Sequence, residues 1–134
     1  MIVTIIEGGE LSFTIARILL LFNHKVNIIR QEREANISRY RELGINTVLG
    51  AGLDTETLAQ PSVAESDVFI ALMDSDLDNL ESCLYIKNNY HNKKTITKVN
   101  NPKYVKKFEQ VGIDIAFDSA LFAFDPTRLN EGKQ

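Results

Sequence analysis

The chain has 134 residues, of which 44% are hydrophobic and 25% are charged, as in a single globular domain with a substantial core. Its net charge of -3 at pH 7 provides no basic surface for nucleic acid. The single cysteine, Cys83, excludes an internal disulfide. No apolar run approaches the roughly 20 residues that span a bilayer, and a strand is predicted where a signal peptide would lie. We therefore expect a soluble, cytoplasmic protein.

Short apolar runs rich in Ile and Val alternate with amphipathic helical patterns along the chain. Such runs predict strands covered on both faces, and their alternation with helices predicts parallel strands with right-handed crossovers. The expected fold is α/β: a Rossmann-like, doubly wound sheet of six mainly parallel strands in a single domain, residues 1–124, followed by a polar tail, residues 125–134. The predicted strands are Ile2–Ile6, Lys25–Ile29, Thr47–Leu49, Val68–Leu72, Thr95–Val99 and Ile113–Phe117.

Helices are predicted between the strands from apolar spacing and from end signals. A polar helix is expected over residues 31–43, closed by Gly44, and a short one over residues 55–60, capped by Asp54 and ended by Pro61. Pro102 and Gly112 suit the start and end of the last helix. Three apolar stripes predict the buried faces of the others: Leu11, Ile15, Ile18, Leu19 and Phe22; Leu77, Leu80, Cys83 and Leu84; and Tyr104, Phe108 and Val111.

The first predicted strand is followed by a glycine turn and a helix, where a nucleotide-binding fold places its phosphate loop. Against the pattern G-x-G-x-x-G, Glu7 and Ser12 replace the outer glycines, and only Gly9 matches, with Gly8 beside it. Two interpretations stay open. The glycines either let phosphates approach backbone N–H groups at the helix start, or they only form a tight turn.

Further candidate residues follow the other strands, at the sheet edge where such folds bind ligands. Arg30 either contacts a ribose phosphate or is a solvent-exposed arginine, and Lys98 either reaches a phosphate or extends to solvent. The complete predicted nucleotide site is Gly8, Gly9, Glu10, Leu11, Ser12, Arg30, Ala51, Gly52, Met73, Asp74 and Lys98.

No metal site and no catalytic group is predicted. An acidic cluster either binds a hard cation or caps a helix, and we favour the cap because the spacing is not that of an EF-hand. The two histidines have no partner at metal-ligand or triad spacing. The cluster comprises Asp74, Asp76, Asp78 and Glu81, and the histidines are His24 and His91.

Three segments carry a family resemblance. They are Gly50–Asp54, Ser66–Leu80 and Lys98–Tyr104, which follow the patterns G-D-G-x-D, D-x-x-I-A-L-T-D-x-D-x-x-N and R-x-N-x-P-x-Y. The resemblance is strongest in these segments, and the match extends over nearly the whole chain. The sequence resembles the KTN/RCK domain of the TrkA-N type, the cytosolic regulatory module of potassium uptake systems and of many potassium channels.

The resemblance implies a non-catalytic domain with a Rossmann-like fold. Such domains form homodimers or rings and bind NAD(H), AMP, ADP, ATP or cations to gate a membrane potassium transporter or channel subunit. This places the protein at the inner face of the membrane through its partner. In the family the segment after the last strand packs across a dimer interface, so we expect Leu121, Phe122 and Phe124 at a homodimer contact.

Several residues depart from the family pattern. Arg30 replaces the acidic residue that accepts ribose hydroxyls, Ala51 replaces the Asp of G-D-G, and Glu10 replaces a basic residue found in some ATP-binding members. The carboxylates of Glu7 and Glu10 would repel a pyrophosphate unless a cation or Arg30 intervenes. We therefore expect weak binding, with AMP or ADP at least as good as NAD(H).

Two alternatives remain. The domain could have lost nucleotide binding and respond to cations or act structurally. An NAD(P)-dependent oxidoreductase would need a substrate-binding region beyond the cofactor fold, for which 134 residues leave no room.

Overall fold

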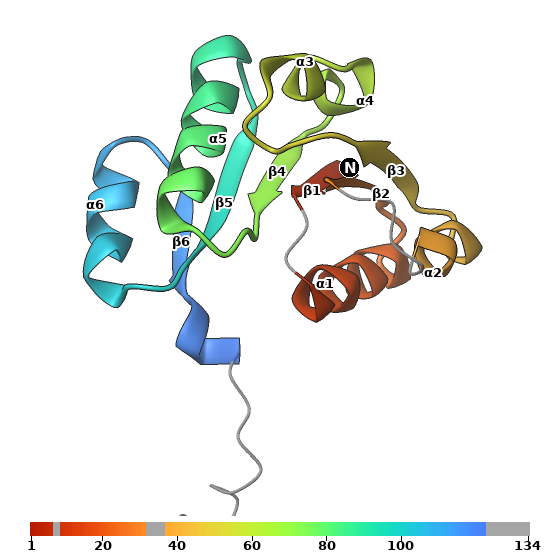
Figure 1. The fold of residues 1–134 in the computed structure, drawn as a ribbon, viewed down its shortest axis with the longest axis horizontal. Helices are drawn as coiled ribbons and strands as arrows, with labels where there is room; N and C mark the ends of the chain where they lie inside the picture. Colours follow the sequence, from red (N-terminus) through yellow and green to blue (C-terminus); the bar gives the residue numbers. More distant parts are fainter. Residues whose placement is uncertain (7–8, 32–36, 123–134) are drawn as a thin grey trace, which may run out of the picture.

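The fold was analysed in a computed structural model, which describes residues 1–6, 9–31 and 37–122. Within these residues six parallel strands form one sheet in the order β3-β2-β1-β4-β5-β6 (Figure 1). The α/β Rossmann-like class is therefore confirmed; the polar tail lies outside the described ranges. The strands are β1 (Ile2–Ile6), β2 (Lys25–Arg30), β3 (Asn46–Leu49), β4 (Val68–Ala71), β5 (Lys94–Val99) and β6 (Ile115–Asp118).

Helices cover both faces of the sheet (Figure 1). One core layer contains Phe69, Cys83 and Phe108 and lies under α3 to α6, and the other contains Ile5, Ile28 and Ala16 and lies under α1 and α2. The helices are α1 (Glu10–Leu21), α2 (Ile37–Glu42), α3 (Thr55–Leu58), α4 (Pro61–Ala64), α5 (Asp76–Asn89) and α6 (Val105–Gln110), with 3-10 turns η1 (Pro102–Tyr104) and η2 (Ser119–Phe122).

Three helices end in the same backbone motif. In α2 the N–H of Gly44 donates to the Arg41 carbonyl and the N–H of Ile45 to the Tyr40 carbonyl, which is the Schellman pattern. The ends of α1 and α6 repeat it with Asn23 and Gly112 in the turn position. All three turn residues have positive φ, at 64°, 79° and 115°, so the predicted roles of Gly44 and Gly112 are confirmed.

The prediction that the apolar stripes form the buried helix faces was wrong at several positions. Ile18, Phe22, Leu77, Tyr104 and Val111 are exposed. Small or polar residues face the sheet instead, namely Ser12 and Ala16 in α1 and Asn79 and Ser82 in α5. The reason is close packing: where a helix lies directly on a sheet, a small side chain fills the contact that a leucine would overfill.

Some element ends also differ from the prediction. The polar helix appears as α2, starting at Ile37, while Gln31 lies in a bend and residues 32–36 lie outside the described ranges. The short helix ends at Leu58, and Pro61 starts α4 as its first residue rather than only ending α3. Ile113 lies before β6, because its N–H completes the turn that ends α6.

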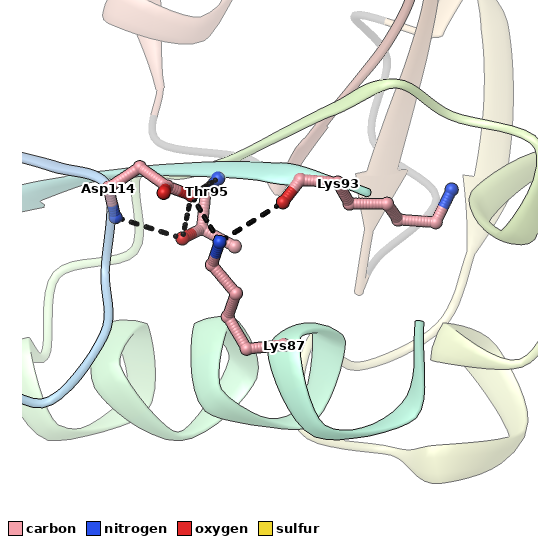
Figure 2. Close-up of polar contacts among 4 residues, drawn as sticks. All are labelled: Lys87, Lys93, Thr95 and Asp114. Atoms are coloured by element: carbon pink, nitrogen blue, oxygen red, sulfur yellow. Dashed lines mark hydrogen bonds and ion pairs between the residues drawn. The ribbon is translucent and has the colours of Figure 1, made fainter. Parts of the chain in front are cut away.

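A charged cluster joins β5, β6 and α5. One carboxylate oxygen of Asp114, just before β6, accepts the backbone N–H of Thr95 at 2.8 Å and its hydroxyl at 3.1 Å. The Lys87 ammonium lies 2.6 Å from the same oxygen and also donates to the Lys93 carbonyl (Figure 2). Although burial raises the pKa of Asp114, the hydrogen bonds from Lys87 and Thr95 outweigh it and hold that pKa below its ordinary value.

This cluster predicts how stability depends on pH. Since the folded-state pKa of Asp114 is lowered, its contribution is present above the unfolded-state pKa and is lost as the pH falls through the folded-state value. We expect Asp114→Asn to lower the free energy of unfolding by about 1–2 kcal/mol at pH 7. Urea unfolding at pH 7 and pH 3 measures this, and the difference from wild type should shrink at pH 3. Glu65→Gln, at an exposed carboxylate, is the control; an equal loss in both variants would contradict the role of Asp114.

Candidate functional site

The parallel sheet brings the predicted site residues to one edge. Gly9 and Glu10 follow β1, Arg30 ends β2, and Ala51 and Gly52 follow β3. Met73 and Asp74 follow β4, and Lys98 lies one residue before the end of β5. Gly8 lies outside the described residues. The remaining predicted residues therefore gather at the carboxyl ends of β1 to β5, where open α/β sheets bind ligands.

The start of α1 has room beside it. Gly9 is the residue before the helix, with φ 66° and ψ -140° and no side-chain cap, and a Cβ added there would meet no heavy atom within 4 Å. Ser12, at the third glycine position, is fully buried. It thus takes the packing role of that glycine. Leu11 packs against the core layer under α1.

The turn after β3 lies over the end of β1 and against the turn after β4. A Cβ on Gly52 would come within 2.8 Å of the Ile6 side chain and 3.1 Å of the Met73 sulfur, and one on Gly50 within 2.1 Å of the Thr57 hydroxyl. Only glycine fits either position without displacement. Asp54 caps α3 as predicted, accepting the N–H of Glu56 at 3.1 Å.

Asn79 is the residue that the sequence interpretation missed. Its buried side chain accepts the N–H of Met73 at 2.8 Å and donates to the carbonyls of Met73 and Lys98 at 3.0 and 3.2 Å. These three bonds hold the turn after β4 against the end of β5. The signal was present, because Asn79 occupies the last position of the pattern D-x-D-x-x-N.

Within the acidic cluster Asp76 binds backbone groups after β5, whereas the N-cap of α5 is Ser75 and not one of the acids. Asp76 accepts the N–H groups of Asn100 and Asn101 at 2.7 and 2.9 Å, and Ser75 caps α5 by accepting the N–H of Asp78. The Asn100 amide donates to the Asp74 carbonyl at 2.7 Å. In the part of the chain that the structure describes, no group of three or more metal-ligating side chains is present.

Arg30 is buried, so the solvent-exposed interpretation of this residue is wrong. It is 4% exposed, and its guanidinium lies 5.1 Å from the centroid of the Tyr40 ring in α2. The prediction failed because the polar residues after Arg30 suggested a solvated segment, whereas Tyr40 folds back over β2.

Glu10 has a basic partner that the sequence did not suggest. Arg39 of α2 donates to its carboxylate at 3.0 Å and lies 3.9 Å from the centroid of the Phe13 ring. The hydrogen bond from Arg39 and its positive charge lower the pKa of Glu10. The carboxylate beside the glycine turn is therefore already paired.

A hollow of about 490 Å³ lies at the opposite edge of the sheet. Its residues precede or begin strands rather than follow them, and none belongs to the predicted site. They are Met1, Asp67, Val68, Asn92, Lys93, Lys94 and Asp114.

Comparison with known proteins identifies related sequences and folds. The model of the TrkA-N domain family matches residues 3–119. A Trk system potassium uptake protein TrkA homolog from Methanothermobacter thermautotrophicus is 34% identical over 114 residues, which make up 85% of this chain and 52% of the relative. The chain thus spans about half the length of this relative.

Solved structures share the fold at lower identity. The GsuK channel bound to NAD has a TM-score of 0.72 and 23% identity, over 85% of this chain and 20% of that one. The Kef CTD of Shewanella denitrificans in its AMP-bound form has a TM-score of 0.76 and 12% identity, over 88% of this chain and 71% of that one.

The bonds of Asn79 generate a stability prediction. Asn79→Ala leaves the N–H of Met73 and the carbonyls of Met73 and Lys98 without this partner, so we expect a loss of about 2–3 kcal/mol in the free energy of unfolding. Urea unfolding measures it. Asn88→Ala, at an exposed position of the same helix, should change stability by less than about 0.5 kcal/mol. Equal stability of the Asn79 variant and wild type would show that the three hydrogen bonds of Asn79 do not stabilise the fold.

Proposed function

The chain belongs to the TrkA-N domain family, and on this premise we propose that it is a cytosolic regulatory domain controlling potassium transport or channel gating. Its ligand is an adenine nucleotide or NAD(H), bound at the glycine turn. The observation that carries the proposal is the open space beside Gly9 at the start of α1, at the sheet edge where the turns after the neighbouring strands converge. The proposed partner is a membrane potassium transporter or channel subunit. No helix in the described ranges is long and apolar enough to cross a membrane.

The ligand class is supported by two solved structures of this fold, one bound to NAD and one to AMP. Phosphates would lie against the first turn of α1, where backbone N–H groups and the helix dipole favour an anion. The turn containing Gly52, held against Met73, would form the opposite wall.

The mechanism is a population shift without catalysis. A ligand that binds one geometry of the assembled domain better than another changes the balance between them, and the membrane subunit responds to that balance. The relative from Methanothermobacter is named as a potassium uptake protein, which favours a regulatory role over an oxidoreductase.

The side chains favour a mononucleotide. Arg30 cannot accept hydrogen bonds from ribose hydroxyls, and its guanidinium is held under Tyr40. Ala51 has no polar side chain to contribute. The contacts that select NAD(H) are therefore weakened, while the glycine turn still admits a phosphate.

We further propose homodimerisation through the half of one sheet face that none of the described helices covers. α1 and α2 lie beside β1 to β3, whereas α5 and α6 cover the other face of β5 and β6 (Figure 1). Ile115, paired with Ile96 in register, points to the face that α1 covers and is 45% exposed. Leu121, which follows in η2, is 74% exposed. Phe124, also expected at this contact, lies outside the described residues.

The nucleotide proposal predicts a ranked set of affinities. By isothermal titration calorimetry we expect AMP and ADP to bind at least as strongly as NADH. Gly9→Ala should abolish measurable binding, because its methyl group enters the open space at the start of α1. Gly44→Ala has the same positive-φ strain but lies at the opposite edge of the sheet, so its affinity should match wild type. A clearly higher affinity for NADH than for AMP and ADP would contradict the ranking. If none of these ligands binds, the alternative of a domain that has lost nucleotide binding is favoured.

The dimer proposal predicts the molar mass of the protein in solution. Light scattering at high micromolar concentration should give at least twice the mass of one chain. Ile115→Asp should shift the protein toward monomer, because a carboxylate on a buried apolar contact is strongly unfavourable. Val111→Asp, at a position just after α6 that is 56% exposed, should leave the mass unchanged. A monomeric wild-type protein would refute the interface.

A further inference from the structure

Aromatic rings and arginines form a connected cluster beside the start of α1. The Phe13 ring meets the Tyr40 ring edge to face, with centroids 5.6 Å apart. The Arg39 and Arg17 guanidiniums lie 3.9 and 5.7 Å from the Phe13 centroid. The cluster therefore brings the positive charge of Arg39 from α2 to the end of α1 that faces the glycine turn.

Arg39 is the member that combines exposure with a fixed position. Its side chain is 40% exposed, whereas Arg30 is buried under Tyr40. Stacking on Phe13 holds the Arg39 guanidinium beside Glu10, since Phe13 follows Glu10 by three residues on the same helix face. The contact of Arg39 with the Phe13 ring is separate from its ion pair with Glu10.

The ion pair between Arg39 and Glu10 is weak. The Glu10 carboxylate lies 3.0 Å from one guanidinium nitrogen and is 77% exposed, and exposed ion pairs of this kind contribute little to stability. The terminal phosphate of a mononucleotide carries more charge than a carboxylate and, like a carboxylate, can accept two parallel hydrogen bonds from a guanidinium. Because Glu10 is the first residue of α1, a phosphate at this helix start would lie within reach of the same guanidinium.

We propose that Arg39 is a phosphate-binding residue of the site and that Glu10 is its internal competitor. When a nucleotide phosphate binds at the start of α1, the Arg39 guanidinium exchanges the Glu10 carboxylate for the phosphate while remaining stacked on Phe13. Glu10 therefore weakens binding chiefly by occupying Arg39 and only secondarily by repelling the ligand. This inference rests on the proposed nucleotide function and goes beyond it by assigning the charged group that holds the phosphate.

A double-mutant cycle tests the exchange, with AMP as the probe and calorimetry as the readout. Arg39→Gln should weaken AMP binding by about tenfold, the loss expected for a charge-assisted hydrogen bond. Glu10→Gln should strengthen it by up to about fivefold by releasing Arg39. In the Arg39→Gln background, Glu10→Gln should bring little further gain, because no guanidinium is left to release.

Two controls complete the experiment. Arg41→Gln removes the same charge from an exposed position of α2 and should leave AMP affinity nearly unchanged. Adenosine, which lacks the phosphate, should bind all the variants alike.

The outcomes separate the two proposals. An equal gain from Glu10→Gln in both backgrounds would show direct repulsion and overturn the exchange, as would unchanged AMP affinity in Arg39→Gln. If neither wild type nor any variant binds AMP, the exchange fails; if ADP and NADH do not bind either, the nucleotide function itself fails. Thermal unfolding of each variant confirms that affinities are compared between folded proteins.

Discussion

Parallel pairing of six strands is the constraint from which the candidate site follows. The strands of the described sheet run in the same direction, so their carboxyl ends lie at one edge of the sheet. The chain must therefore cross a face of the sheet, through a helix or a turn, to reach the next strand. Between β1 and β4 the order of strands reverses along the chain. The turns after these strands leave toward opposite faces, and this divergence opens the crevice that such folds use for ligands.

The turns at this edge are held by side chains that satisfy backbone groups. Asn79 bonds the turn after β4 to the end of β5, and Asp76 receives two N–H groups after β5. Gly52 lets the turn after β3 contact Met73. Each contact joins segments distant in sequence, so loss of one partner would leave backbone groups without that partner or create a steric clash. The edge is therefore preorganised before any ligand binds.

Charge at the edge is arranged differently from what the residue types alone indicate. The arginine after β2 is buried against an aromatic ring, and the carboxylate after β1 is neutralised by an arginine of α2. Aromatic rings position the guanidiniums, since they provide an attractive face without consuming hydrogen-bond donors. Arg39 retains a fork of donors that can serve either a carboxylate or a phosphate.

The sequence by itself determined the six strands, the caps at Asp54, Gly44 and Gly112, and the family, because each depends on local periodicity, on backbone conformation or on short motifs. It also located the edge at which the site residues gather. Only the tertiary structure decided that Leu77 is exposed while Asn79 is buried, that Tyr40 covers Arg30, and that Arg39 pairs with Glu10. The bonds of Asn79 reach the end of β5, 19 residues away, and Arg39 is 29 residues from Glu10. Periodicity identifies the faces of one element, whereas these contacts depend on how closely separate elements pack on the sheet.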